Sequence, residues 1–334
     1  MGKIAFVCAT AFAAAVMAVM ANAAPVTVKF ATVAPEGSMW TDVLKEINSD
    51  IKTRTGGRVE FKIYPGGIAG DEPDVLRKMR VGQYHGAGFT GVGLGEVLGK
   101  TRILELPFMF RSLQELDYVK SRITPEIEAG LKEKGFVFLG WAEPGLVYIF
   151  AQKPIHGPAD MNGVKMWGWE ADPLAAAIFK AFKVTPVHIA LPDVLMGLQT
   201  GMLNAVYGPP LAAMALQWHT KVKFMMSEPL TNSTGGVLVS KKTWDRMQPQ
   251  DQAVVKSAFL TGLDKLTAVT RKQNNEAIAR FKQFGIKIVS ITKTDIEEMI
   301  KVASIVRPQL VGKLYSADLL KRVEGWLAEK RLAE

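Results

Sequence analysis

Short runs of alternating apolar and polar residues open the chain, and helical patterns separate them. Residues 26–33, 58–64 and 84–90 have the pattern or composition of strands. Residues 38–52 and 72–81 instead repeat apolar positions every three to four residues, as an amphipathic helix does. Strands and helices that alternate in this way predict an α/β fold with parallel strands and ligand loops at their carboxyl ends.

The pattern changes in the second part of the chain. Two strands in close succession are predicted at 136–143 and 146–153, and further strands follow at 163–169, 185–189, 203–207 and 286–291. Residues 249–284 hold almost no helix breaker, so they predict a helix long enough to span two lobes. Two C-terminal helices complete the chain. We therefore predict two α/β lobes between which the chain crosses more than once.

The N-terminus has the composition of a secretory signal. Lys3 precedes an apolar run at residues 4–20, and the sequence ANA at residues 21–23 has the small-residue spacing of a cleavage site. We expect residues 1–23 to be a signal peptide that is cleaved after Ala23, which places the mature protein in the periplasm. An uncleaved membrane anchor is the alternative.

Charge and cysteine content exclude several classes of protein. The chain has 41 Lys and Arg against 32 Asp and Glu, but the basic residues are spread along it. Nucleic-acid binding needs a basic stripe with interleaved aromatics, so we expect a solvated surface and no nucleic-acid partner. The single cysteine, Cys8, lies inside the signal. The mature chain then has no thiol, which excludes disulfides and thiolate chemistry.

Motifs for cofactors and catalysis are incomplete. Residues 86–91 (GAGFTG) match a dinucleotide-binding pattern, but no acidic residue ends a second strand at the required distance. Residues 99–101 (GKT) end like a phosphate loop, whose first glycine is replaced by Leu94. The histidines lack metal-ligand spacing, and no G-x-S-x-G motif occurs. Two acids at a helix start, such as Glu170 and Asp172, are usually helix-dipole partners. We expect no cofactor, no metal and no enzyme.

Several segments carry a family pattern in order along the chain. They are KFATVAP (29–35), RTGGRVEFKIYP (54–65), LPFMF (106–110), GVKM (163–166) and LQTG (198–201). With them the chain resembles the periplasmic solute-binding receptors of TRAP transporters, the DctP-like family. The resemblance implies a two-lobed binding protein of type II, with chain crossovers at a hinge, that closes on a small organic anion. It also implies delivery to integral-membrane permease subunits, driven by an ion gradient.

The resemblance also predicts how the chain divides. We expect lobe I to comprise residues 24–145 and about 234–272, and lobe II to comprise residues 146–233 and about 273–334. The long helix spans both lobes, and the protein is expected to be a monomer.

Departures from the family pattern concern the ligand. After the GVKM segment the family characteristically has an arginine that binds the ligand carboxylate, and this chain has Trp167. A second family arginine would fall near Leu146 or Val147 and is also absent. Tyr207 stands near a position where an amide normally faces the ligand. A carboxylate buried without a charge partner costs several kcal/mol. We therefore expect a ligand that is less anionic, more apolar or more aromatic than the family's usual carboxylates.

The candidate ligand-binding residues are mostly aromatic. Strand alternation puts Trp167 and Trp169 on one face, so both line the cleft or one belongs to the core. The other candidates lie near strand ends or where the family pattern changes: Tyr207, Phe89, Thr90, Glu36, Glu143, Glu170 and Trp218. For Glu36 and Glu143 the alternative is a cap on neighbouring backbone, and for Trp218 it is a place in the core.

Two further functions fit the same scaffold. One is a receptor that presents its ligand to a sensor, which an adjacent sensor-kinase gene would favour over adjacent transporter genes. The other is a periplasmic lyase or hydrolase that uses Glu170, Asp172 or Glu143. Turnover of ligands by the purified protein would favour it.

Overall fold

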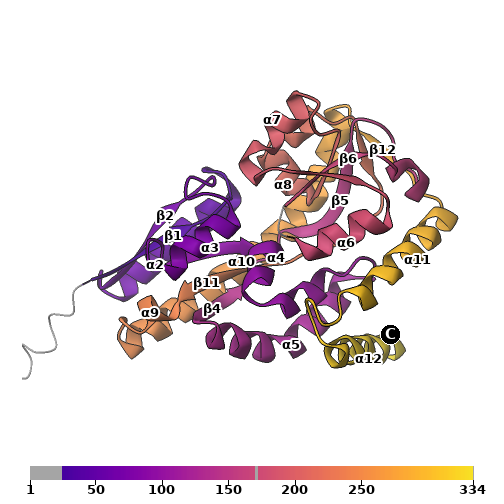
Figure 1. Cartoon of the computed structure of the whole chain (residues 1–334). Coiled ribbons are helices and arrows are strands. Elements are labelled where there is room, and N and C mark those ends of the chain that lie inside the picture. The colour runs from indigo at the N-terminus through magenta and orange to yellow at the C-terminus, as the bar shows by residue number, and fades with distance from the viewer. Residues whose placement is uncertain (1–24, 170–171, 334) are drawn as a thin grey trace, which may run out of the picture.

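Two β-sheets, each covered by helices, form the structure, which is a computed structural model describing residues 25–169 and 172–333 (Figure 1). The first sheet has the strand order β2-β1-β3-β11-β4. Its strands are β1 (Val26–Ala31), β2 (Val59–Tyr64), β3 (Gly86–Thr90), β4 (Phe136–Trp141) and β11 (Gly235–Ser240). The pairs β1–β2 and β1–β3 are parallel, as the alternation of strands and helices predicts, whereas β11 is antiparallel to both of its neighbours.

Helices on this side of the molecule follow the predicted apolar stripes. They are α2 (Met39–Arg54), α3 (Glu72–Arg80), α4 (Gly91–Val97), the 3-10 segment η1 (Gly99–Glu105), α5 (Leu113–Glu133) and the short α9 (Lys241–Trp244). The hydroxyl of Ser38 accepts a hydrogen bond from the Thr41 N–H and caps α2, as the sequence predicts. Helix α2 buries Val43 and Ile47 in the same hydrophobic cluster as β1.

The second sheet has the order β12-β9-β5-β8-β6-β7, and β10 also pairs with β5. Its strands are β5 (Gly145–Ala151), β6 (Lys165–Gly168), β7 (Thr185–His188), β8 (Ala205–Gly208), β9 (Phe224–Met226), β10 (Thr231–Ser233) and β12 (Lys287–Val289). Around it lie α6 (Pro173–Ala181), α7 (Val194–Gln199), α8 (Pro210–Ala215), α11 (Lys293–Gln309) and the 3-10 segments η2 (Pro158–Met161), η3 (Leu191–Asp193) and η4 (Trp218–Thr220). Strand β6 runs parallel to β7 and β8, with Trp167 opposite Val187.

One helix, α10 (Pro249–Gln283), belongs to both halves, as the scarcity of helix breakers predicts. Its first part buries Phe259 and Leu263 in the cluster under the first sheet. Its last part buries Ala277 and Phe281 in the cluster under the second sheet. Figure 1 shows α10 running between the two groups of elements. The chain also passes between the sheets directly, from β4 to β5 and from β10 to β11.

A charged and polar cluster fixes α10 to the β4–β5 crossing. Arg271 Nε and Nη2 donate to the Glu143 carboxylate at 2.8 and 2.7 Å, and Arg271 also donates two bonds to Asp117. Lys120 donates a further bond to Glu143 at 3.1 Å. These hydrogen bonds raise the pKa of Arg271, so it stays charged. One turn further along the helix, Asn274 Nδ2 donates to the Pro144 carbonyl at 2.9 Å.

The C-terminal helix α12 (Ala317–Leu332) lies elsewhere than expected. The lobe boundaries stay a prediction, but that prediction grouped all of 273–334 with the second lobe, and α12 packs against α5 beside the first sheet. The reason is its apolar stripe, since Leu319, Val323 and Leu327 join the hydrophobic cluster of α5. Helix α11 does pack against α6 of the second sheet. The two C-terminal helices thus cover different halves of the molecule (Figure 1).

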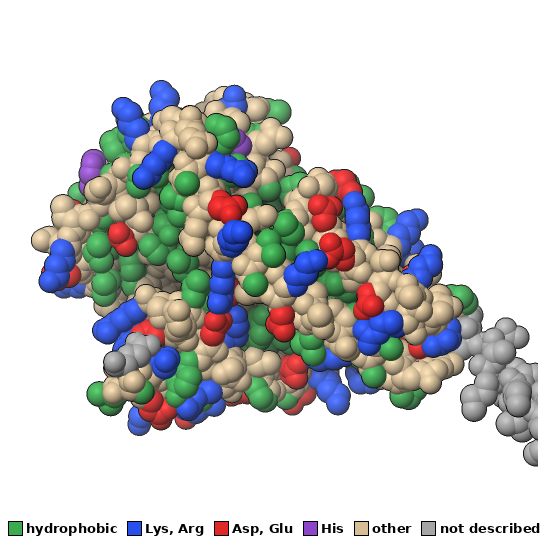
Figure 2. All heavy atoms as spheres, turned by 180° about the vertical axis from the view of Figure 1, so that it is seen from behind, with side chains coloured by type: hydrophobic (Ala, Val, Ile, Leu, Met, Phe, Trp, Pro, Cys, Tyr) green, Lys and Arg blue, Asp and Glu red, His purple; other side chains and the backbone are tan. Residues whose placement is uncertain are grey.

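The surface carries mixed charge. On the face shown in Figure 2, Lys and Arg side chains are interspersed with Asp and Glu. This distribution agrees with the solvated surface expected from the sequence. Within the described residues, no helix is both long and apolar enough to cross a membrane.

The Arg271 cluster generates a stability prediction. We expect Arg271→Leu to lower the free energy of unfolding by about 3 kcal/mol, because among the described residues it leaves the buried Glu143 carboxylate paired with Lys120 alone. Urea unfolding followed by circular dichroism measures this. Arg54→Leu is the control, since it breaks an exposed ion pair with Asp50 and should cost less than about 1 kcal/mol. Equal losses in the two variants would contradict the importance of the cluster.

Candidate functional site

Two adjoining cavities lie between the sheets. The inner cavity has a volume of about 170 Å³ and the outer one about 590 Å³. They share five lining residues, which come from both halves and from the crossing: Thr90, Pro144, Leu191, Ala212 and Leu216. Thr90 ends β3, and β8 ends just before Pro209, another residue of the inner wall. The cavities therefore occupy the place between lobes where an α/β binding protein takes its ligand.

Aromatic rings form one wall of the inner cavity. Trp167 stacks on Tyr207 at a centroid distance of 5.3 Å and lies 4.4 Å from Trp169 and 5.4 Å from Trp218. Trp167 is 2% exposed, and its Nε1 donates to the Ile189 carbonyl at 3.0 Å. All four rings line the cavity. Trp167 and Trp218 therefore belong to the core and to the cavity at once: their side chains are buried, and they also form part of the cavity wall.

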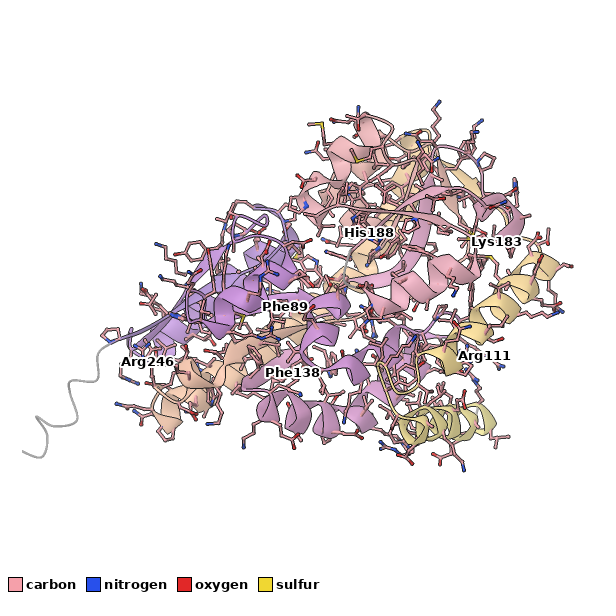
Figure 3. The ribbon with its side chains drawn as sticks, in the orientation of Figure 1. Phe89, Arg111, Phe138, Lys183, His188 and Arg246 are labelled. Carbon is pink, nitrogen blue, oxygen red and sulfur yellow. The ribbon has the colours of Figure 1, made fainter. Side chains whose placement is uncertain are left out.

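Local packing explains why β6 places these rings there. Side chains alternate along the strand, so Trp167 and Trp169 share a face and Gly168 lies on the other. A Cβ at Gly168 would lie 2.7 Å from the ring of Phe179, so only glycine lets α6 approach so closely. His188 Nδ1, on the neighbouring strand β7, donates to the Trp169 carbonyl at 3.1 Å. Figure 3 shows His188 on the second-sheet side and Phe89 on the first.

A buried ionic group that the sequence interpretation missed also lines the inner cavity. Arg102 Nη2 donates to both oxygens of Asp172 at 3.0 and 2.8 Å, and Nη1 lies 2.6 Å from Glu105. Burial works against the charge of Arg102, but the two carboxylates raise its pKa overall. Burial raises the pKa of the Glu105 carboxyl, although the positive charge of Arg102 works in the opposite direction. Asp172 also accepts from the Leu174 and Ala175 N–H groups, which confirms its predicted place at the start of a helix.

Among the described residues, three polar atoms at the inner cavity lack a hydrogen-bond partner. They belong to Arg102 (Nε), Tyr207 (the hydroxyl) and Asn232 (Oδ1), all of which line the cavity. Burial raises the pKa of Tyr207, so its hydroxyl keeps its proton and remains a donor. An unpaired buried polar group costs free energy, so a ligand with one acceptor and one donor would gain from meeting these atoms.

Thr90 and Phe89 lie on the first-sheet side, as expected. Thr90 lines both cavities, and Phe89 lines the outer one. Behind them lies Glu72, which accepts hydrogen bonds from the Thr90 N–H, the Thr90 hydroxyl and the Gly93 N–H at 2.7 to 2.8 Å. Burial outweighs these three bonds and raises the pKa of Glu72 to about 7.

Two candidates lie away from the cavities. Glu36 forms an exposed ion pair with Lys45 on α2 and does not line either cavity. Glu143 points instead to Arg271 on α10 and Lys120 on α5, and it lines neither cavity. Charge pairing thus decides the orientation of both side chains. Glu170 falls outside the described residues. No group of His, Asp or Glu suited to a metal ion occurs in the described part of the chain.

Residues 30–310 match the family model of bacterial extracellular solute-binding proteins, family 7, also called DctP. The chain belongs to this family. A curated relative is the 2,3-diketo-L-gulonate-binding periplasmic protein YiaO of Escherichia coli, with 25% identity over 291 residues, 84% of this chain and 86% of the relative. The family assignment confirms the resemblance inferred from the sequence motifs, and the protein is a TRAP-type solute receptor.

Solved structures of the family confirm the two-lobed α/β fold. A TRAP periplasmic solute-binding protein from Ralstonia eutropha H16, with bound (S)-2-acetolactate, has a TM-score of 0.85 at 23% identity and covers 91% of this chain and 99% of its own. The sugar acid binding protein from Advenella mimigardefordensis in complex with galactonate has a TM-score of 0.86 at 15% identity, with 92% and 99% covered. At these identities the likeness shows the fold of the receptor alone.

The buried Glu72 generates a prediction about pH. Between its ordinary pKa of 4.5 and about 7, the unfolded chain loses this proton while the folded receptor keeps it. The free energy of unfolding should therefore fall by about 3 kcal/mol as the pH rises through this window, and stay level above it. Glu72→Gln cannot ionise, so subtracting its urea-unfolding curve from that of the wild type isolates the effect. If the difference in unfolding free energy between the wild type and Glu72→Gln does not change between pH 4.5 and 7, Glu72 has its ordinary pKa.

Proposed function

We propose that this receptor binds a small, ring-sized apolar molecule without net negative charge and delivers it to integral-membrane TRAP permease subunits. One observation carries the proposal: Arg102, the only cation among the described residues that line the two cavities, is already paired with Asp172 and Glu105. A ligand carboxylate would then find no free cation, and its burial would cost several kcal/mol.

The size and lining of the inner cavity support a ring as the ligand body. Its 170 Å³ is close to the roughly 150 Å³ of a cavity that takes a benzene molecule. Trp167, Trp169, Tyr207 and Trp218 line it with aromatic side chains, and aromatic pairs contribute about 1 kcal/mol beyond the area they bury. The unpaired Tyr207 hydroxyl can donate to one acceptor on the ring.

The receptor is also proposed to be exported, bind without turnover and act as a monomer. Residues 1–23 would be removed after Ala23, which a mass measurement of the mature periplasmic protein tests. Its family consists of extracellular solute-binding proteins, which supports both the location and the lack of chemistry. Of the acids considered for catalysis, Glu143 is engaged by Arg271 and Asp172 by Arg102.

A ligand screen tests the proposed class directly. We expect native mass spectrometry of gently purified protein to detect a small uncharged ligand, and benzamide to raise the melting temperature more than benzoate or succinate does. Benzamide and benzoate have the same size, so they separate the effect of charge from that of shape. Tight binding of succinate, with no response to uncharged rings, would refute the proposed ligand class.

A change of a single oxygen tests the role of Tyr207. Tyr207→Phe removes a buried hydroxyl without a partner, so the free energy of unfolding should stay within about 0.5 kcal/mol of the wild type or rise. Affinity for benzamide should fall about fivefold, because one hydrogen bond is lost. Isothermal titration calorimetry measures the affinity. Tyr148→Phe is the control, since Tyr148 is buried in the same cluster but does not line the cavities. Equal affinities for all three proteins would exclude Tyr207 from the site.

A further inference from the structure

The ion pair between Arg102 and Asp172 joins the two halves of the receptor. Arg102 lies on η1, between α4 and α5 of the first-sheet side. Asp172 is the N-cap of α6, which packs beside β7 and α11 of the second-sheet side. Their side chains are 6% and 3% exposed. The second carboxylate on Arg102, that of Glu105, comes from η1 itself. Asp172 is thus the partner that reaches across the cleft.

A second polar contact crosses the cleft beside it. Asp71, the N-cap of α3, accepts from Trp169 Nε1 at 2.8 Å and from the Leu191 N–H at 3.4 Å. The two halves therefore meet through bonds that the protein makes with itself.

We propose that Asp172 is a built-in anion that takes the place of a ligand carboxylate on Arg102 and so sets the selectivity of the site. This inference rests on the proposed function of the receptor. Asp172 closes the halves over the cavity and excludes anionic ligands at the same time. It is a specificity-determining residue that acts through Arg102.

The charges around the cavities explain the exclusion. Besides Arg102 and the protonated Tyr207, the ionisable side chains that line them in the described part of the chain are all carboxylic acids: Asp42, Glu72, Glu105 and Asp172. A ligand carboxylate can form a bidentate pair with the two Nη groups of Arg102 only by displacing Asp172 and Glu105, and at the unpaired Nε it would still meet two carboxylates around one cation. A displaced carboxylate would stay buried without a cation, which is a strongly unfavourable state. An uncharged ligand leaves the pair intact and can still meet Arg102 Nε, which has no partner.

The test removes the charge of Asp172 and keeps its shape. Asparagine is as good an N-cap as aspartate, so Asp172→Asn should preserve the bonds to the Leu174 and Ala175 N–H groups of α6. With Glu105 as the one carboxylate left on Arg102, we expect affinity for benzoate to rise at least about tenfold over the wild type, since a hydrogen bond to a charged group is worth that much. Affinity for benzamide should not rise. Isothermal titration calorimetry measures both.

A second measurement reports how far the two halves close in the absence of ligand. We expect ligand-free Asp172→Asn to have a larger radius of gyration than the wild type in small-angle X-ray scattering, and benzoate to reduce it again. The matched control is Asp251→Asn, since Asp251 is a buried aspartate at the start of α10, paired with Arg58 within one half of the molecule. This variant should lose stability but keep wild-type compactness and benzoate affinity.

The outcomes separate this inference from the proposed function. A benzoate affinity of Asp172→Asn that equals that of the wild type, or a gain that Asp251→Asn shares, overturns the role of Asp172. Unchanged compactness of Asp172→Asn overturns its role in closure. The proposed ligand class instead fails on the wild type alone, if that protein prefers benzoate to benzamide. Glu105→Gln extends the test, because it removes a negative charge beside Arg102 that comes from the same half, and its amide oxygen can still accept from the Thr234 N–H at the β10–β11 crossing, so it should not expand the receptor.

Discussion

The rest of the structure depends on how helix α10 holds the strand crossing between β4 and β5. The helix is continuous over 35 residues and contributes to both hydrophobic clusters, so it fixes where the halves meet. Arg271 and Asn274 bind the crossing at Glu143 and Pro144. Gly145 has a φ of +122°, and a Cβ there would lie 2.4 Å from the Asn274 amide. The crossing therefore has one conformation in contact with the helix, and the cavities open directly beside it.

This frame explains why the site is both apolar and ionic. The carboxyl ends of β3, β6 and β8 bring Thr90, Trp169 and Pro209 to one place, and aromatic rings line the cavity there. A cation does reach the cavity, but from η1 and with two acids attached. With Trp167 where the resemblance implies an arginine, the site is still not uncharged. Its charges are satisfied within the protein.

Much of this could be predicted from local sequence patterns. Strand alternation, the cap at Ser38 and the unbroken run of α10 are features of neighbouring residues, and so is the shared face of Trp167 and Trp169. The orientations of the residues that the sequence analysis misplaced or missed depend on partners far away in the sequence. Glu143 is turned away from the cleft by Arg271, which lies 128 positions later. Arg102 enters the site through Asp172, 70 positions away. A charged pair in the apolar stretch RILELPF was the available signal, because Arg102 and Glu105 are too polar to be buried singly.

Closure of this receptor is best understood as a balance between its own bonds and those of the ligand. When only a fraction of the receptor molecules has the conformation that binds the ligand, the apparent affinity falls in proportion to that fraction. Bonds such as Arg102–Asp172 and Asp71–Trp169 populate the closed state in advance, which favours a ligand that itself offers few polar groups. A buried ion pair contributes little net stability, because desolvation offsets its attraction. The pair can therefore favour the closed arrangement by only a small free energy, so that a permease can still open the receptor.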